Sequence, residues 1–308
     1  MRVFQSTRRH LFAACAALFL FGATQAQTAV RVGSKIDTEG SLLGNVIVLV
    51  LESQGIKTEN KLQLGATKIV RGALTAGEID IYPEYTGNGA FFFADEKHPA
   101  WKNAQAGYER IKALDRDKNK LVWLQPSPAN NTWAIAIRKD VAASQKLKSL
   151  DDFGRWVAAG GKVKLAASAE FVERPDALPA FQSAYGFKLK QDQLLTLAGG
   201  DTAVTVKAAA EQTSGVNAAM AYGTDGPVAA LGLLILEDPK GVQPVYAPAP
   251  VVRAEVLARS PKIGTALEPV FRALDTATLQ RLNAQIALEG QDAKQVAQAW
   301  LKSKGFIK

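Results

Sequence analysis

The sequence is short of the residue types on which many enzymes and metalloproteins depend. It contains one cysteine, Cys15, and two histidines, His10 and His98, among 308 residues. Cys15 and His10 fall in the N-terminal export signal predicted below, so we expect the mature chain to keep only His98. A chain without a thiol forms no disulfide, and a single histidine cannot build a histidine triad or a multi-histidine metal site. We therefore expect no metal, no cofactor and no thiol chemistry.

Long apolar runs are also missing after the first 26 residues. Arg2, Arg8 and Arg9 precede an apolar segment at 11–23, and a small-x-small site follows at 24–26. This order is typical of a secretory signal peptide. No later run approaches the roughly 20 apolar residues that a membrane-spanning helix needs. We predict that residues 1–26 are a cleaved signal peptide and that the mature protein is periplasmic.

The remaining charge is modest and dispersed. Without Arg2, Arg8 and Arg9 the formal net charge falls from +8 to +5, and the lysines and arginines form no basic run. This distribution does not favour a nucleic-acid site. With 47% hydrophobic and 21% charged residues, the chain is long enough for two globular units of about 100 to 150 residues each.

Strand and helix patterns alternate along the chain. Residues 30–34 predict a short strand, and Asp37 predicts the start of an apolar helix. The pattern repeats with a strand at 62–64 and a helix that is capped by Thr67 and stops at Gly77. Such alternation predicts an α/β fold in which a mainly parallel sheet is flanked by helices.

The stretch from 77 to 93, GEIDIYPEYTGNGAFFF, combines a strand pattern with two tyrosines and a proline. Pro83 lacks an N–H for a strand ladder, so we expect the chain to leave the sheet there. Tyr82 and Tyr85 would then lie at the carboxyl end of a strand, where ligands gather in open α/β sheets. The alternative is that either tyrosine is a half-buried packing residue.

Proline-rich and polar residues at 126–131 interrupt the alternation and mark a passage between two lobes. We predict that lobe one begins with 27–130, that lobe two spans 131–221, and that 222–308 returns to lobe one and covers it with helices. Trp133 starts the first strand of lobe two. It either faces the space between the lobes or packs in the core of lobe two.

Two cations lie in loops where an anionic ligand group would suit them. Lys35 follows the first strand, close to the N-terminus of the next helix. Its alternative is a solvated loop lysine. Arg174 lies in a lobe-two loop and has the fork geometry for a carboxylate. Its alternative is an ion pair with Glu170, Glu173 or Asp176.

Several segments, in order along almost the whole mature chain, resemble the glycine betaine, choline and carnitine (osmoprotectant) substrate-binding proteins of ABC importers. They are GSKIDTEG from Gly33, GEIDIYPEYTG from Gly77, NNTWAIAIR from Asn130, ASAEFVER from Ala167 and AYGTDG from Ala221. The resemblance implies a type II periplasmic binding protein whose ligand cleft lies between the lobes. It also implies a quaternary ammonium solute, a monomeric protein, and ABC permease and ATPase subunits as partners.

The resemblance further implies an aromatic cage for the solute. Tyr85 and Tyr222 match cage walls, and Trp133 stands where the family usually has a tyrosine. The other positions that the resemblance assigns to the ligand site are Lys35, Asn88, Asn131, Arg174, Thr224 and Asp225. Aromatic faces suit a trimethylammonium group, which has no N–H to donate, at about 0.5 to 2 kcal/mol each.

One further cage tyrosine of the family has no aromatic counterpart at 194–201, LLTLAGGD, so we expect an incomplete cage and modest affinity. A binding protein for another small solute, such as a polar amino acid or a non-quaternary compatible solute, remains the alternative. An enzyme would need a fixed acid–base pair from carboxylates such as Glu84, Glu170 and Asp225, and the sequence does not fix their separation.

Overall fold

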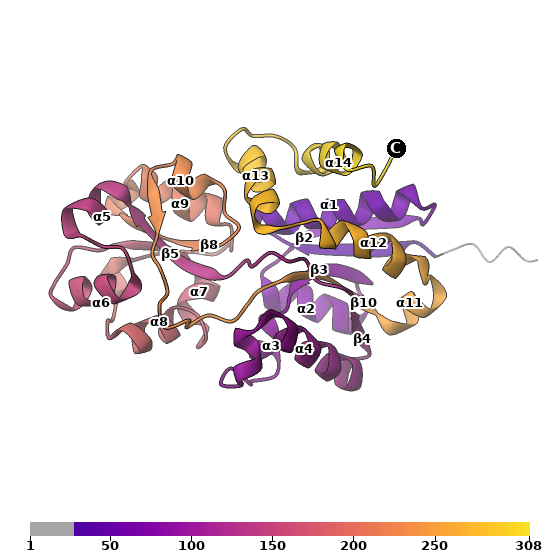
Figure 1. The fold of residues 1–308 in the computed structure, drawn as a ribbon, viewed down its shortest axis with the longest axis horizontal. Coiled ribbons are helices and arrows are strands. Elements are labelled where there is room, and N and C mark those ends of the chain that lie inside the picture. Colours follow the sequence, from indigo (N-terminus) through magenta and orange to yellow (C-terminus); the bar gives the residue numbers. More distant parts are fainter. Residues whose placement is uncertain (1–27) are drawn as a thin grey trace, which may run out of the picture.

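The computed structural model describes residues 28–308 and shows two lobes joined by two extended connections (Figure 1). Each lobe is built on a five-stranded sheet flanked by helices. This arrangement confirms the predicted two-lobed α/β fold. The predicted signal peptide, residues 1–26, lies outside the described residues. Within the described part of the chain, no helix is long and apolar enough to span a bilayer.

Lobe one contains the strand order β2-β1-β3-β10-β4, in which only β10 runs antiparallel to its neighbours. Its elements before the first crossing are β1 Val30–Lys35, α1 Thr38–Ser53, β2 Thr58–Gly65, α2 Thr67–Ala76, β3 Ile81–Tyr85, α3 Asn88–Phe92, a 3₁₀ turn Pro99–Lys102, α4 Ala104–Asn119 and β4 Leu121–Trp123. The strand β10, Pro248–Arg253, enters this sheet after the chain has passed through lobe two.

The ends of the first two helices follow from local side-chain chemistry. Asp37 caps α1 as predicted, because its carboxylate accepts the Gly40 N–H at 2.6 Å. Helix α2 differs from the prediction: its cap is Ala66, which offers no side-chain acceptor, and Thr67 is its first residue. Gly77 ends α2 in the left-handed region at φ 74°, as expected of a glycine stop.

The prediction that the chain leaves the sheet at Pro83 is wrong. Strand β3 continues to Tyr85, and Pro83 lies opposite Pro250 of β10. The Pro250 carbonyl accepts the Leu124 N–H on its other side at 3.0 Å, so the missing N–H of Pro250 also faces away from β3. Two prolines therefore fit because they oppose each other at a pair that exchanges no hydrogen bond.

Lobe two repeats this plan with the strand order β7-β6-β8-β5-β9, in which β5 is the antiparallel strand. Its elements are β5 Trp133–Arg138, α5 Lys139–Gln145, α6 Leu150–Ala158, β6 Leu165–Ser168, α7 Ala169–Glu173, α8 Leu178–Tyr185, a 3₁₀ turn Gln191–Gln193, β7 Leu194–Leu197, α9 Thr202–Ala210, a 3₁₀ turn Thr213–Gly215, β8 Ala218–Tyr222, α10 Pro227–Ala230 and β9 Leu233–Ile235. Arg174, predicted to lie in a loop, directly follows the short helix α7, which is capped by Ser168.

The predicted return to lobe one at residue 222 comes too early. Strand β9 pairs with β5, so the chain stays in the lobe-two sheet as far as Ile235. It crosses back between β9 and β10. The turn at 223–226 is therefore a connection within lobe two, and the hydrophobic β9 that follows it forms the edge of that sheet.

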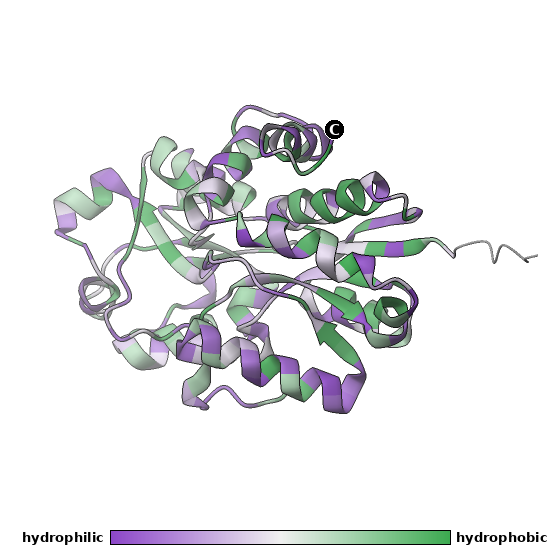
Figure 2. Cartoon of the chain, turned by 45° about the vertical axis from the view of Figure 1, so that its right-hand side comes forward, coloured by the Kyte–Doolittle hydropathy of each residue, from purple (hydrophilic) through white to green (hydrophobic). Residues whose placement is uncertain are grey.

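The C-terminal helices pack on lobe one (Figure 1). They are α11 Ala254–Arg259, α12 Lys262–Arg272, α13 Thr276–Ala287 and α14 Ala293–Ser303. Leu42 and Val46 of α1 share a buried cluster with Phe271 and Trp300. Figure 2 shows hydrophobic and hydrophilic residues alternating along these helices, as expected for helices that bury one side. Helix α13 also contacts α10 of lobe two.

Candidate functional site

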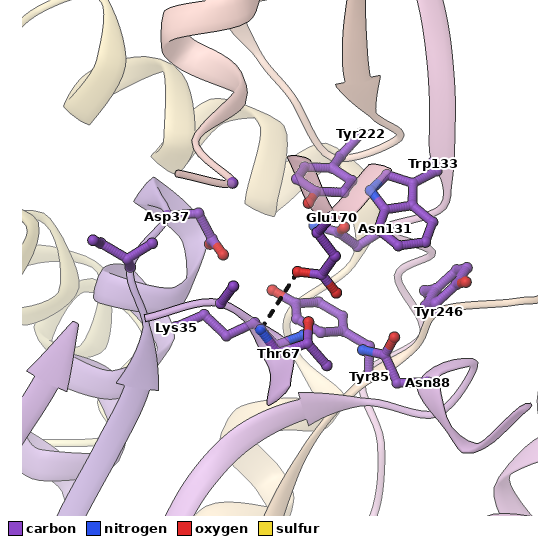
Figure 3. Close-up of a pocket in the computed structure, with 13 residues that line it drawn as sticks. Lys35, Asp37, Thr67, Tyr85, Asn88, Asn131, Trp133, Glu170, Tyr222 and Tyr246 are labelled. Atoms are coloured by element: carbon purple, nitrogen blue, oxygen red, sulfur yellow. Dashed lines mark hydrogen bonds between the residues drawn. The ribbon is translucent and has the colours of Figure 1, made fainter. Parts of the chain in front are cut away.

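A small cavity of about 30 Å³ lies between the lobes (Figure 3). Lobe one contributes Lys35, Asp37, Thr67, Tyr85 and Asn88 to its wall. Lobe two contributes Trp133, Glu170 and Tyr222, and the two connections contribute Asn131 and Tyr246. A cavity of this volume holds about two or three waters. The lobes are therefore closed on each other around the site.

Aromatic rings from both lobes and from the return connection face this cavity. Trp133 lies nearly parallel to Tyr222, with ring centroids 6.4 Å apart and an interplanar angle of 20°. Tyr246 lies 5.7 Å from Trp133 and tilted by 59°. Tyr85 completes the wall from the side of lobe one. The cavity thus has an aromatic wall, Tyr246, that the sequence analysis did not assign.

A buried carboxylate organises the lobe-one side of the cavity. Glu84 is fully buried and forms an ion pair with Lys35 at 2.8 Å. It also accepts hydrogen bonds from the Tyr82 hydroxyl at 2.8 Å, the Tyr85 N–H at 2.7 Å and the Asn88 amide at 2.7 Å. Lys35 in turn lies 4.6 Å from the centroid of the Tyr85 ring. Tyr82 is thus a buried packing residue, which is the alternative that the sequence analysis gave for this tyrosine.

A second buried carboxylate, Glu39, fixes the first connection to lobe one. It accepts hydrogen bonds from the Tyr85 hydroxyl at 2.9 Å, the Asn131 amide at 2.7 Å and the Asn283 amide at 2.7 Å. The Asn131 amide also donates to Thr224 Oγ1 at 2.6 Å. Asn131 therefore lines the cavity, and its amide N–H donors link Glu39 of lobe one to Thr224 of lobe two.

Arg174 is engaged by the chain itself. Its guanidinium donates to both carboxylate oxygens of Asp176, at 2.9 and 2.6 Å, and to Glu170 at 2.9 Å. It also donates to the Asn88 side-chain oxygen of lobe one at 2.9 Å and lies 4.5 Å from the Trp133 ring centroid. Arg174 is therefore an ion-pair residue, which is the alternative that the sequence analysis gave for it. Its fork supports the back of the Trp133 ring.

Glu170 reaches across the cavity from lobe two. Its carboxylate accepts the Thr67 N–H at the start of α2, at 3.4 Å (Figure 3). Burial raises the pKa of this carboxyl, but Lys35 and Arg174 lower it by more, so the pKa of Glu170 lies below its usual value. Glu170 therefore stands ionised inside the site.

Two aspartates beside the site have the opposite shift. Burial raises the pKa of Asp37, at the cavity wall, to about 6. Burial also raises the pKa of Asp225 to about 7, against the hydrogen bonds that it accepts from the Tyr222 N–H at 2.7 Å and from Thr202 at 2.8 Å. Asp225 and the fully buried Thr224 lie behind the cavity wall, where they position Tyr222 and Asn131.

Comparison with known proteins identifies the family. The family model described as the substrate binding domain of ABC-type glycine betaine transport system matches residues 28–303. The glycine betaine-binding protein YehZ of Escherichia coli K12 is 69% identical over 284 residues, which cover 92% of this chain and 93% of that protein. The chain belongs to this family. Its members are the substrate-binding components of ABC transport systems.

A further relative and two solved structures are also similar to this chain. A glycine-betaine-binding protein of Pseudomonas aeruginosa is 34% identical over 307 residues, which cover 97% of this chain and 95% of that protein. The structure of apo YehZ from E. coli, 69% identical, matches with a TM-score of 0.67 and covers 91% of this chain and 99% of that chain. A glycine betaine/carnitine/choline ABC transporter structure, 22% identical, shares the fold with a TM-score of 0.70 and covers 91% of this chain and 100% of that chain.

The structure brings most of the predicted site residues to one cavity. Those at its wall are Lys35, Tyr85, Asn88, Asn131, Trp133 and Tyr222, whereas those behind it are Arg174, Thr224 and Asp225. The wall residues that the sequence analysis did not assign include Asp37, Thr67, Glu170 and Tyr246. Asp37 was recognisable as the helix cap at the end of a strand. Nothing local to Tyr246 marks it, since it lies in a proline-rich connection.

Proposed function

We propose that this protein is the periplasmic solute-binding component of an ABC importer and that it binds a quaternary ammonium solute of the glycine betaine type between its lobes. The observation that carries the proposal is the aromatic cluster of Trp133, Tyr222 and Tyr246 with Tyr85 across the cavity. A trimethylammonium group is a diffuse cation without N–H donors, so ring faces hold it better than hydrogen-bond acceptors do.

The charges at the cavity suit such a solute. Asp37 and Glu170 place carboxylates next to the aromatic rings, where they favour a cation. Lys35 lies 4.6 Å from the Tyr85 ring centroid and acts on both Asp37 and Glu170, so its charge favours an anionic group on the lobe-one side of the cavity. A zwitterion with a cationic head and a carboxylate tail matches a site that offers both aromatic rings with carboxylates and a lysine.

Of the three carboxylates named for an enzyme, Glu84 and Asp225 have structural roles and Glu170 is held by Arg174 and the Thr67 N–H, which argues against catalysis. Glu84 is surrounded by donors of lobe one, and Asp225 accepts the Tyr222 N–H. Neither lines the cavity, so neither can touch a bound solute. The protein therefore delivers its solute unchanged to permease and ATPase subunits in the inner membrane. It acts as a monomer and is exported by its signal peptide.

Titration calorimetry of the mature protein with glycine betaine, choline, carnitine and proline tests this function. We expect heat of binding with the quaternary amines. In Tyr222→Ala we expect a loss of about tenfold in affinity, since one ring contributes about 0.5 to 2 kcal/mol. Tyr222→Phe keeps the ring and should bind like the unmodified protein. Binding of proline or other amino acids alone would keep the fold and overturn the ligand class.

A further inference from the structure

The Glu170 carboxylate occupies a position built for an anion. It belongs to α7 of lobe two and is paired with Arg174, yet its other oxygen accepts the Thr67 N–H of lobe one, the first N–H of the ten-residue helix α2. The cap residue of α2, Ala66, provides no side-chain acceptor. The first N–H groups of a helix need acceptors from elsewhere and favour negative charge. Glu170 supplies that acceptor across the gap between the lobes.

Neighbouring cations reinforce the same position. Lys35 and Arg174 both act on Glu170, and together they hold its pKa below the usual value although burial opposes this. Figure 3 shows the carboxylate projecting into the cavity between the Thr67 backbone and the aromatic rings. The cavity is small, about 30 Å³, so a solute carboxylate that reaches these donors would lie directly against the Glu170 carboxylate.

The cavity also holds a donor without an acceptor. Trp133 is 6% exposed, and within residues 28–308 its indole N–H has no hydrogen-bond partner. The indole nitrogen points into the cavity (Figure 3). Burial raises the pKa of Tyr222, and this N–H lies close enough to the Tyr222 hydroxyl to oppose that rise. A donor that lacks a well-aligned partner in the described part of the chain is open to an acceptor on a bound molecule.

We propose that Glu170 is a tethered stand-in for the solute's carboxylate, which replaces it at the N-terminus of α2 beside Lys35. This inference rests on the proposed function and specifies its substrate class as betaines that carry a carboxylate. A carboxylate-bearing solute competes with Glu170 for the anion position. A carboxylate-free cation such as choline does not compete, and Glu170 then remains as its counter-charge. Glu170 is thus a residue that sets the preference between these two kinds of solute.

Calorimetry with glycine betaine and choline tests this on the mature full chain. In Glu170→Gln the competing charge is gone, so we expect glycine betaine to bind about tenfold tighter and choline to bind the same or more weakly. Glu173→Gln is the matched control, because Glu173 is an exposed residue of the same helix. It should leave both affinities unchanged. Equal weakening of both ligands, or no change in either, would overturn the proposal.

A second pair of variants tests the helix terminus itself. Thr67→Pro removes the N–H at the first helical position, where proline is tolerated, and Ala66 at φ −73° and ψ 173° is compatible with a following proline. We expect Thr67→Pro to weaken glycine betaine several-fold and to spare choline, whereas Thr67→Ala keeps the N–H and binds both as before. Parallel changes in the two ligands would contradict the subsite. If the unmodified protein bound neither ligand, the proposed function itself would fail.

Discussion

The two lobes are built on one plan but present different chemistry to the solute. In the orders β2-β1-β3-β10-β4 and β7-β6-β8-β5-β9, strands β3 and β8 hold the same place, and their last residues are Tyr85 and Tyr222. Each tyrosine lies opposite the antiparallel strand that enters from the other lobe. Equivalent backbone positions therefore deliver one aromatic wall from each side.

The surroundings of these two tyrosines differ. The Tyr85 hydroxyl is held by Glu39 and its ring is covered by Lys35. The Tyr222 ring faces Trp133, whose N–H is unpaired among the described residues. Lobe one is thus a finished wall around Tyr85, in which the Tyr85 hydroxyl, Lys35 and Asn88 all have partners within the chain. Lobe two keeps its aromatic surface available for the solute.

The largest expected effect comes from breaking the finished wall. Glu84→Ala would leave the buried Lys35 without its counter-charge, so we expect a loss of about 3 to 5 kcal/mol in the free energy of unfolding. Chemical denaturation monitored by tryptophan fluorescence measures it. Glu78→Ala, at an exposed position of the same segment, should cost little. A loss below about 1 kcal/mol in Glu84→Ala would contradict the role given to this carboxylate.

A pH dependence of about 2 kcal/mol is expected from the lobe-two side. The folded-state pKa of Asp225 is raised by burial from 3.8 to about 7, so the folded state binds its proton more tightly than the unfolded chain does. The resulting stability is present below about pH 4 and is lost as the pH rises through 7. Asp37, raised to about 6, acts in the same direction.

Thermal unfolding between pH 5 and pH 8 measures this dependence. Stability should fall over that range, and Asp225→Asn should flatten the profile. Asp192→Asn, at an exposed position of lobe two, serves as the control and should leave the profile unchanged. An equally steep profile in Asp225→Asn would assign the effect to other groups.

Contact between the lobes gives the third prediction. A Cβ added at Gly226 of lobe two would lie 2.0 Å from the Gln280 carbonyl oxygen in α13. Gly226 has φ −67°, so alanine fits its backbone and the clash alone opposes closure. We expect Gly226→Ala to weaken glycine betaine about tenfold, which corresponds to 1.4 kcal/mol, with little change in the unfolding of either lobe.

Calorimetry and small-angle X-ray scattering measure affinity and lobe opening in this variant. Gly72→Ala is the control, because a Cβ at Gly72 would meet no atom within 4 Å. If Gly226→Ala bound glycine betaine and scattered X-rays like the unmodified protein, the prediction would be wrong. Helices α10 and α13 would then be free to separate in the bound state.

The smallest expected effect is a difference of about 1 kcal/mol between the equivalent tyrosines. Tyr85→Phe removes the hydrogen bond to Glu39, so we expect a loss of about 1.5 kcal/mol in stability. Tyr222→Phe should lose less than about 0.5 kcal/mol, because no carboxylate in the described part of the chain accepts its hydroxyl. Denaturant titration of the two variants side by side measures the difference. Equal losses would remove the contrast between the lobes.

Local patterns were enough for much of the fold. The Asp37 cap and the Gly77 stop each depend on residues within one turn of a helix, and both are present. Pro83 misled the prediction because its tolerance depends on Pro250, far away in sequence. Whether a strand tolerates a proline depends on the strands with which it pairs, and the local sequence does not identify those strands.

The candidate site was predictable where its residues end strands. Lys35, Tyr85 and Tyr222 all do so, and all line the cavity. Tyr246 was missed because it enters the site only through pairing of the two connections. Glu170 was named as a partner for Arg174 and as a carboxylate that an enzyme could use, but not as a cavity wall, because its contact with Thr67 exists only when the lobes meet.

The two connections between the lobes lie side by side as a short ribbon. The Asn131 N–H donates to the Tyr246 carbonyl at 2.9 Å, and the Tyr246 N–H donates to the Asn130 side-chain oxygen at 2.8 Å. When the lobes turn about such a ribbon, an atom travels in proportion to its distance from the axis. Trp133 and Tyr246, at the pivot, travel least, and the walls farther out sweep toward them. A solute that contacts these two rings therefore lies close to the axis about which the lobes turn.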